Sequence, residues 1–302
     1  MKAEKRKAQR KEMGMIYMIC NPTAGSGQGE KTGIRIQKLL DAEGRENKLL
    51  FTRYPGHATL LSEQARNEGA ELVLAVGGDG TAYETARGLA GTPVPFGIIP
   101  AGTGNDFIKA IGIPKEPEKA LAHILSHPAQ KTDAGEINGR MFLNEIGTGF
   151  DVSVLDYAAK AKKYVRGLLP YLYGVLKTLF RFRSIPITYA IDGGESATLD
   201  AFVVGVANGR MIGGGICIAP EARADDGLLD VVLVGKIDRK KLLSRLVGLM
   251  QGKILSFPET KFYRAASVTF SAPDMRVNAD GEIISEKTVS ARILPGALMI
   301  CR

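Results

Sequence analysis

The chain has 302 residues, of which 45% are hydrophobic and 24% charged, and its formal net charge is +8. These values lie near the averages for folded soluble chains and exclude a disordered, collagen-like or disulfide-scaffold protein. The cysteines Cys20, Cys217 and Cys301 stand far apart without a CxxC pair, so we expect a reducing compartment and neither a disulfide framework nor a zinc site. No charge-free stretch is both long and apolar enough for a membrane span, and no apolar signal segment follows the basic start, so we expect a cytoplasmic protein.

Short apolar runs alternate with helical patterns from residue 15 to about residue 130. Strands are predicted at residues 15–20, 47–52, 72–76 and 96–99, and helices at residues 29–43, 57–68, 81–89 and 117–125. Such alternation is typical of βαβ units around a mostly parallel sheet. We therefore expect a three-layer α/β domain over residues 15–133, with a basic tail over residues 1–14.

Strand-like, glycine-punctuated runs dominate the rest of the chain. They lie at residues 140–146, 187–191, 201–207, 216–219, 229–234, 267–271, 276–278 and 289–293. Several alternate apolar and polar residues, as antiparallel strands with one solvated face do. Helices are predicted at residues 156–183, with a break or kink at Pro170, and at residues 239–251. We expect a β-sandwich-like antiparallel domain over residues 134–290, and the return of residues 291–302 to the first domain stays an option.

Three glycine-rich turns follow three successive predicted strands of the first domain. They are Asn21-Pro22-Thr23-Ala24-Gly25-Ser26-Gly27, Gly77-Gly78-Asp79-Gly80-Thr81 and Pro100-Ala101-Gly102-Thr103-Gly104-Asn105-Asp106-Phe107. In a parallel sheet, the loops at the carboxyl ends of the strands line one crevice. Glycine lets backbone N–H groups approach phosphate oxygens, and helix N-termini favour the same anions. The turns therefore predict a site for a nucleotide or a polyphosphate.

Two common nucleotide motifs do not account for these turns. Lys31-Thr32 is preceded by Glu30, so the Gly-Lys-Ser/Thr ending of a P-loop is missing. No Gly-x-Gly-x-x-Gly stands at a strand–helix junction with a matching acidic residue, which disfavours a dinucleotide oxidoreductase.

The sequence resembles the diacylglycerol kinase catalytic-domain family, in its bacterial soluble lipid-kinase branch, a relative of the NAD kinases. The family's Asn-Pro-x-x-Gly opening, GGDGT loop and Pro-x-Gly-Thr-x-Asn-Asp-Phe loop stand at residues 21–25, 77–81 and 100–107, and further matches lie at residues 132–135, 144–151, 207–209, 225–230 and 280–282. GGDGT alone is shared with NAD kinases, so the third loop and the late Asp-Gly-Glu make the resemblance specific. The family often has Asn where this chain has Tyr83, although Glu84 still follows.

The resemblance implies a lipid kinase that uses ATP and Mg²⁺, with its active site in the cleft between the two domains. It implies nucleotide contacts at Asn21, Pro22, Thr23, Ala24, Gly25, Thr52, Gly78, Asp79, Gly80, Thr81, Glu84, Thr103 and Asn105. Asp280 or Glu282 is the implied base for the acceptor hydroxyl, and Asp79 is a further catalytic acid. The Asp226 carboxylate, with the carbonyls of Arg223 and Leu228, is the implied structural Mg²⁺ site, a ligand set that suits a hard cation.

Several alternatives stay open from the residues alone. An Asx-turn explains Asp79, and ordinary turns explain Asp225-Asp226-Gly227 and Asp280-Gly281. One alternative is an NAD kinase, which shares the GGDGT loop. The other is a protein that binds lipid or nucleotide without catalysing a reaction. The acceptor stays open among diacylglycerol, phosphatidylglycerol and sphingoid lipids. The oligomeric state is equally open, a homodimer being one option.

Positive charge is concentrated in two stretches. Residues 2–12 hold six Lys or Arg against two Glu, and the seven basic residues between Asp156 and Asp192 have no acidic residue among them: Lys160, Lys162, Lys163, Arg166, Lys177, Arg181 and Arg183. Such charge favours an anionic partner. With the resemblance, we expect a lipid substrate at an anionic membrane surface, peripheral to the inner face, and no nucleic acid. A solvated tail and a solvated helix face are the alternative.

Overall fold

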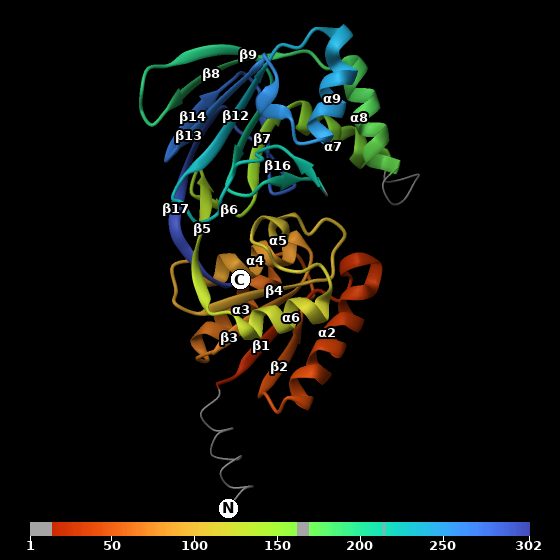
Figure 1. Cartoon of the computed structure of the whole chain (residues 1–302), viewed down its shortest axis with the longest axis vertical. Coiled ribbons are helices and arrows are strands. Elements are labelled where there is room, and N and C mark those ends of the chain that lie inside the picture. The colour runs from red at the N-terminus through yellow and green to blue at the C-terminus, as the bar shows by residue number, and fades with distance from the viewer. Residues whose placement is uncertain (1–13, 162–168, 214) are drawn as a thin grey trace, which may run out of the picture. The chain divides into compact units, whose positions relative to one another are not determined.

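The computed structural model describes residues 14–161, 169–213 and 215–302 (Figure 1). The chain divides into two compact units. The first unit comprises the residues up to Ala134 together with Pro295–Arg302, and the second unit is Gly135–Leu294. The basic residues of the first 13 positions, and Lys162, Lys163 and Arg166, lie outside the described residues. None of the described helices combines the length and the apolar content needed to cross a membrane.

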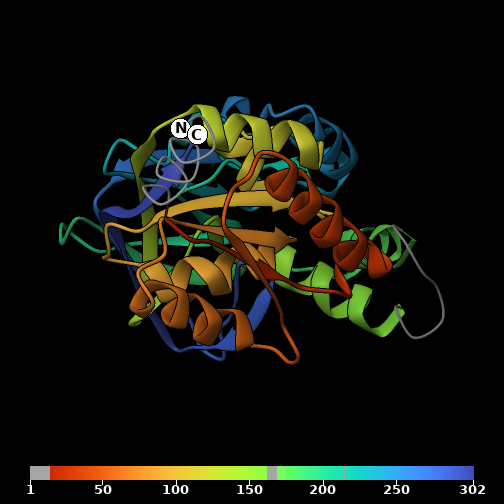
Figure 2. The same ribbon diagram turned by 90° about the horizontal axis from the view of Figure 1, so that it is seen from below.

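The first unit is an α/β domain around a parallel sheet, which confirms the predicted fold. Its strands are β1 (Ile16–Cys20), β2 (Asn47–Phe51), β3 (Leu72–Gly77) and β4 (Pro95–Pro100), in the order β2-β1-β3-β4. Its helices are α2 (Ala24–Ala42), α3 (His57–Asn67), α4 (Asp79–Leu89), α5 (Asp106–Ala110) and α6 (Pro117–Ser126). In Figure 2 the red and yellow-green helices α2 and α6 cover one face of the sheet, and the orange helices α3 and α4 cover the other.

Burial explains the strands of this unit. Every residue of β1 and β3 is buried, as expected for central parallel strands with a helix layer on both sides. The helices bury one face each, for example Ile36 and Leu40 of α2 and Leu121 and Ile124 of α6. The sheet is extended by the end of β17 (Thr288–Cys301), which runs parallel to β4 at Met299 and Ile300.

The second unit is antiparallel and rich in strands, as predicted. Its sheet runs in the order β16-β15-β7-β9-β8-β14-β17, and β12 pairs with both β9 and β13. The strands are β5 (Ala129–Ile137), β6 (Arg140–Phe142), β7 (Glu145–Gly149), β8 (Ile185–Ile191), β9 (Ala197–Ala207), β12 (Leu229–Gly235), β13 (Thr260–Ala265), β14 (Ser267–Ser271), β15 (Arg276–Ala279) and β16 (Glu282–Ser285), with the short pair β10 (Met211–Ile212) and β11 (Ile216–Cys217). Strands β5 and β17 each begin in one unit and end in the other.

Helices cover part of this antiparallel sheet. They are α7 (Phe150–Ala161), α8 (Leu169–Arg181) and α9 (Leu242–Met250), with 3₁₀ turns η1 (Arg239–Lys241) and η2 (Ile254–Ser256) around α9. One apolar cluster lies among the strands and includes Phe142, Val231 and Phe270. A second cluster, which includes Phe150 of α7 and Val175 of α8, is the surface on which all three helices pack.

The predicted helix over residues 156–183 differs from the structure at its start, because helix α7 already begins at Phe150. The described part of α8 is Leu169–Arg181, and residues 162–168 lie outside the described residues, so the break or kink at Pro170 stays a prediction. The sequence analysis also missed the strands β5, β10, β13 and β16 and the short helix α5. Strands β13 and β16 are half-exposed and have no continuous apolar run.

Two glycines of α4 give a matched test of the packing between α3 and α4. A Cβ at Gly88 would lie 2.1 Å from Ser62 Oγ and 2.6 Å from the Thr59 carbonyl oxygen, whereas a Cβ at Gly80 would meet nothing within 4 Å. We expect Gly88→Ala to lower the free energy of unfolding by about 1–3 kcal/mol through overpacking. Gly80→Ala should leave it unchanged or raise it, since alanine is favoured in a helix. Thermal and urea unfolding would check this, and equal stabilities of the two variants would contradict the packing.

Candidate functional site

A cavity of about 540 Å³ lies at the carboxyl ends of β1 to β4, within the first unit. Ten of the predicted nucleotide contacts line it: Asn21, Pro22, Thr23, Ala24, Gly25, Thr52, Gly78, Gly80, Thr81 and Glu84. The other three, Asp79, Thr103 and Asn105, are not among the lining residues. The lining also includes Gly102 of the third predicted turn, and four residues that the sequence analysis missed, namely Arg53, Tyr54, Pro55 and Ala58. Arg53 to Pro55 directly follow Thr52 at the end of β2. This position after a strand was the sequence feature from which their place in the lining could have been predicted.

The first glycine-rich turn is folded tightly against the start of α2. The side chain of Asn21 accepts hydrogen bonds from the backbone N–H of Thr23 at 3.1 Å and from its hydroxyl at 2.9 Å. Gly25 has a φ of +56°, and a Cβ there would lie 2.2 Å from the carbonyl oxygen of Ala101. The turn therefore needs glycine at this position, both for its backbone conformation and for its contact with the third turn.

The second and third turns meet backbone to backbone. The carbonyl oxygen of Gly77 accepts hydrogen bonds from the N–H of Ala101 at 2.7 Å and of Gly102 at 3.1 Å. A Cβ on Gly102 would lie only 2.4 Å from the Cα of Gly78. Asn105, whose side chain donates to the Gly102 carbonyl at 2.9 Å, holds the far side of the third turn. The two turns thus form a single rigid wall of the cavity.

Asp79 joins these two turns through its side chain. One carboxylate oxygen accepts from the N–H groups of Asp106 at 2.7 Å and Phe107 at 3.2 Å, the first two residues of α5. Burial raises the pKa of Asp79 and the neighbouring Asp106 carboxylate adds to this, while the N–H donors act in the opposite direction. In this structure Asp79 therefore organises the third turn.

Glu84 combines a cavity position with a capping role. Its two carboxylate oxygens accept from the N–H of Gly56 at 2.8 Å and of Ala58 at 3.1 Å, at the start of α3. These N–H groups have no partner within the helix, so a carboxylate at this place stabilises the helix end. The segment after β2, with Arg53 and Tyr54, is thereby fixed beside the cavity.

The two acids predicted as alternative bases have different surroundings in the second unit. Asp280 and Gly281 form the two-residue turn between β15 and β16, with φ values of +46° and +95°. The carboxylate of Asp280 accepts three backbone hydrogen bonds, from Leu143 at 2.6 Å, Asn144 at 2.9 Å and Glu145 at 3.0 Å. Glu282 is exposed, and its side chain makes no hydrogen bond within the described part of the chain.

The sequence analysis did not predict the buried polar side chains next to this turn. Asn278 accepts from the N–H of Gly281 at 2.8 Å and donates to the buried Glu145 at 3.3 Å. Both carboxylate oxygens of Asp151 are buried and have no hydrogen-bond partner among the described residues. Burial raises the pKa of Asp151. The motif over residues 144–151 was the only sequence signal for this group.

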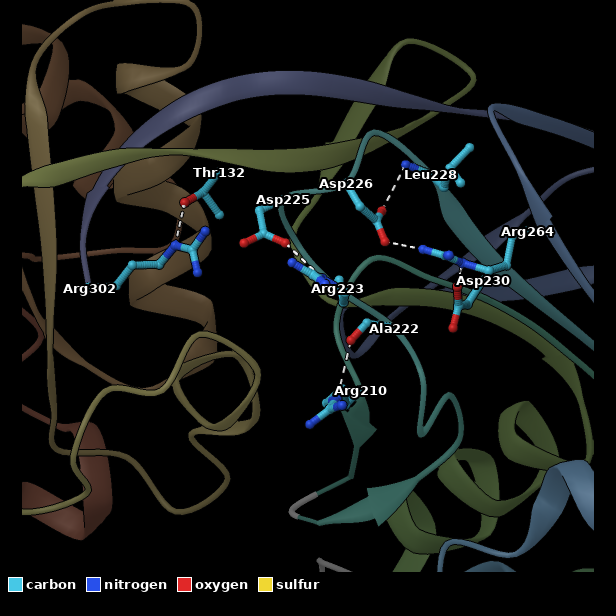
Figure 3. Close-up of polar contacts among 10 residues, drawn as sticks. All are labelled: Thr132, Arg210, Ala222, Arg223, Asp225, Asp226, Leu228, Asp230, Arg264 and Arg302. Carbon is cyan, nitrogen blue, oxygen red and sulfur yellow. Dashed lines mark hydrogen bonds and ion pairs between the residues drawn. The ribbon is translucent and has the colours of Figure 1, made fainter.

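The predicted metal residues form a charged turn in the second unit (Figure 3). One oxygen of Asp226 accepts from the N–H of Leu228 at 3.1 Å, and the other pairs with the guanidinium of Arg264, which also reaches Asp230 at 3.4 Å. Arg223 instead pairs with Asp225 at 3.2 Å. No group of three or more His, Cys, Asp or Glu with metal-site geometry occurs among the described residues.

The charges of this turn nevertheless suit a hard cation. Two carboxylates, Asp226 and Asp230, share the single guanidinium of Arg264, and Asp230 Oδ2 is buried without a hydrogen-bond partner in the described structure. The turn therefore carries an excess of negative charge. Carboxylate and carbonyl oxygens are the ligands that Mg²⁺ and Ca²⁺ prefer.

The burial of Asp230 predicts a pH dependence of stability. Burial raises the pKa of Asp230 to about 6, and Arg264 only partly opposes this. The folded state then binds the proton more tightly than the unfolded chain, so this contribution to stability is full below about pH 4 and is lost as the pH rises through about 6. In wild type, this effect lowers the free energy of unfolding by at most about 3 kcal/mol as the pH rises over that range. In chelator-containing buffer, Asp230→Asn should not show this decrease.

Urea unfolding between pH 4 and 7 would measure this effect. Asp200→Asn removes an exposed carboxylate from the neighbouring strand β9 and is the control, because it should keep the wild-type slope. An unchanged slope in Asp230→Asn would contradict the assignment.

Known proteins match both units of this chain. Residues 15–137 match the diacylglycerol kinase catalytic domain, and residues 144–302 match the YegS C-terminal NAD kinase beta sandwich-like domain. A Mycobacterium tuberculosis protein named diacylglycerol kinase is 32% identical over 300 residues, which is 97% of each chain. A Pseudomonas aeruginosa protein, a candidate YegS-like lipid kinase by name, is 37% identical over 268 residues, 85% of each chain.

Solved structures agree with these sequence matches. A crystal structure from Bacillus anthracis, described as that of a candidate diacylglycerol kinase, matches with a TM-score of 0.77 and 25% identity, over 95% of this chain and 96% of that one. The matched domains, the relatives and the fold point to the same conclusion. The chain belongs to the diacylglycerol kinase family of lipid kinases, which phosphorylate an alcohol group.

Proposed function

We propose that this lipid kinase transfers the γ-phosphoryl group of ATP, with Mg²⁺, to the hydroxyl of diacylglycerol or of a related lipid such as phosphatidylglycerol. The observation that carries the proposal is the cavity of the first unit, whose wall is made of three glycine-rich turns. The choice of acceptor is supported by the name of the Mycobacterium tuberculosis relative.

The cavity has the features that a triphosphate needs. Helix α4 begins at Asp79, between the lining residues Gly78 and Gly80. Residues 25–27 have positive φ values, so the regular part of α2 begins only after the lining turn at residues 21–25. Helix N-termini and glycine backbone attract phosphate oxygens, and the hydroxyl of Thr81 adds a donor. Arg53, the only basic residue among the described lining residues, adds a positive charge. We therefore assign the triphosphate to the turns at residues 21–25 and 78–81.

Glu282 is the better base of the two acids in the Asp-Gly-Glu turn. Asp280 already accepts three N–H bonds, so its oxygens hold the turn in place. Glu282 is exposed and without a hydrogen bond in the described chain, so its carboxylate is available to a substrate. In the proposed reaction Glu282 takes the proton of the lipid hydroxyl, the hydroxyl oxygen bonds to the γ-phosphorus, and the bond to ADP breaks.

The charged turn of the second unit is the proposed place for a structural Mg²⁺. The carboxylate of Asp226 and the carbonyl oxygens of Arg223 and Leu228 would hold it. A bound divalent cation there would supply the positive charge that Arg264 alone does not provide for Asp226 and Asp230. This ion has no part in the proton transfer described above.

We also propose that the protein works at an anionic membrane surface, as a peripheral protein of the inner face. Its lipid substrates reside there, and anionic lipid attracts basic residues. Of the basic stretch after Asp156, the described residues Lys160, Arg181 and Arg183 are exposed.

The test of the function is a panel of acceptors. Purified protein is incubated with γ-labelled ATP, Mg²⁺ and, in separate mixed micelles, diacylglycerol, phosphatidylglycerol or a sphingoid lipid, with NAD in a further reaction. Label in diacylglycerol or phosphatidylglycerol supports the proposal. Label in NAD alone would favour the NAD kinase alternative, which the description of the C-terminal domain match makes worth including. ATP binding without any transfer would favour a silent binding protein.

A pair of variants separates the roles of Glu282 and Asp280. Glu282→Gln should lower kcat by about 10²–10⁴-fold, with ATP binding and thermal stability unchanged, because it removes a proton acceptor from an exposed position. Asp280→Asn should lower thermal stability as well, since it weakens three partly buried hydrogen bonds from backbone N–H groups. Steady-state kinetics, ATP titration and thermal unfolding of both proteins check this. Normal turnover in Glu282→Gln would place the base elsewhere.

A further inference from the structure

Helix α9 carries an outward stripe of exposed apolar side chains. Leu243, Val247 and Met250 are 65%, 48% and 71% exposed, and no other large apolar side chain among the described residues is as exposed as Leu243 or Met250. Their spacing of i, i+4 and i+7 places the three side chains on one face of the helix. Water therefore contacts a continuous apolar strip.

The opposite face of α9 accounts for its attachment to the second unit. Leu242, Leu246 and Leu249 pack on the apolar cluster that includes Phe150 and Phe257. Gly248 approaches the Phe257 ring so closely that a Cβ would lie 2.8 Å from it. Figure 1 shows α9 beside α7 and α8, which pack on the same cluster. The outer stripe thus has no role in holding α9 to the protein.

Exposed basic residues lie at both ends of α9. Residues 236–253 include six Lys or Arg and one acidic residue, Asp238. Lys236, Arg239, Lys240, Lys241 and Lys253 are exposed, and none of them forms an ion pair within the described structure. The nearby acids are already engaged, since Glu259 pairs with Arg245 at 3.0 Å and Asp238 accepts from the N–H of Lys240.

We propose that α9 is a membrane-docking helix, which inserts Leu243, Val247 and Met250 into an anionic lipid surface while Arg239, Lys240 and Lys241 contact the headgroups. An apolar strip bordered by basic residues is the pattern of a helix that lies in a bilayer interface. The proposal rests on the proposed function insofar as a lipid kinase meets its acceptor at such a surface.

Charge favours lipid over a second copy of the chain as the occupant. A two-fold contact would place the stripe against its own copy, and with it the basic run Arg239–Lys241 of η1 near its equivalent. Such like charges repel each other. Anionic headgroups instead attract each exposed Lys or Arg.

Vesicle binding of matched triple and double variants tests the proposal. Leu243→Ser, Val247→Ser and Met250→Ser are combined, and the control combines Ile34→Ser and Leu60→Ser, which are 40% and 53% exposed on α2 and α3 of the first unit. In co-sedimentation with phosphatidylglycerol-rich vesicles without ATP, the α9 variant should bind at least about tenfold more weakly, and the control should bind like wild type. Equal binding of the α9 variant would overturn the proposal.

A fluorescence probe keeps the test independent of variant stability. The chain has no tryptophan, so Val247→Trp and, as control, Leu60→Trp each provide a single indole signal. Anionic vesicles should shift the emission of Val247→Trp to the blue, and high salt during mixing should reduce the shift. Emission of Leu60→Trp should stay unchanged. An unchanged emission of Val247→Trp, or a shift equally large with neutral phosphatidylcholine vesicles, would overturn the proposal.

Two further measurements separate this proposal from the proposed function. Turnover of a short-chain, water-soluble diacylglycerol should be unchanged in the α9 triple variant, because its substitutions lie outside the cavity and the Asp-Gly-Glu turn. Vesicle binding by Glu282→Gln should equal that of wild type even though its kinase activity is lost. If wild type phosphorylates no lipid but still binds vesicles through α9, only the proposed function fails. If the α9 variant changes the sedimentation coefficient and leaves vesicle binding intact, the stripe is a dimer contact and the docking proposal fails.

Discussion

The cavity of the first unit depends on one backbone contact, the approach of the turn after β3 to the turn after β4. The Gly77 carbonyl oxygen accepts from two N–H groups of the third turn, and Gly102 lies so near Gly78 that a Cβ would not fit. Because neighbouring parallel strands end at the same edge of a sheet, these turns are already close, and glycine lets them touch. Any side chain at Gly102 would push the turns apart and open the wall to which we assign the phosphates.

Carboxylates hold the backbone in place around the cavity of the first unit and around the Asp-Gly-Glu turn of the second. Asp79 holds the start of α5, Glu84 holds the start of α3, and Asp280 holds the connection before β7, each by accepting backbone N–H bonds. Such charge-assisted bonds are stronger than neutral ones. The three acids are thereby engaged in structure, and this sets apart Glu282, which is exposed and next in sequence to a rigid turn. An exposed carboxylate on a hydrogen-bonded hairpin is well suited to accept a proton from a substrate that arrives from outside.

The parallel half of the fold was predictable because buried parallel strands are continuous apolar runs, as in β1 and β3. Strands β13 and β16 escaped prediction because they are half-exposed and their composition resembles that of loops. Most residues of the first two motifs line one cavity, since turns at the ends of neighbouring strands meet. The motifs did not reveal that Asp79 turns its carboxylate to α5, because a motif gives no side-chain direction. Arg53 was missed because only the fold shows that the segment after β2 reaches the cavity.

The sequence pattern of helix α9 likewise does not predict how much of the helix is buried. Its sequence LLSRLVGLM is apolar on nearly every side, which in a soluble domain usually indicates a buried helix. The structure buries one side only, and the other side then costs free energy in water unless something covers it. Positive charge around the stripe attracts an anionic surface over about 8 Å at physiological salt, whereas apolar contact acts only at insertion. A helix with both features would first be drawn to the lipid by charge and then be retained by its side chains, so salt should slow capture more than it speeds release.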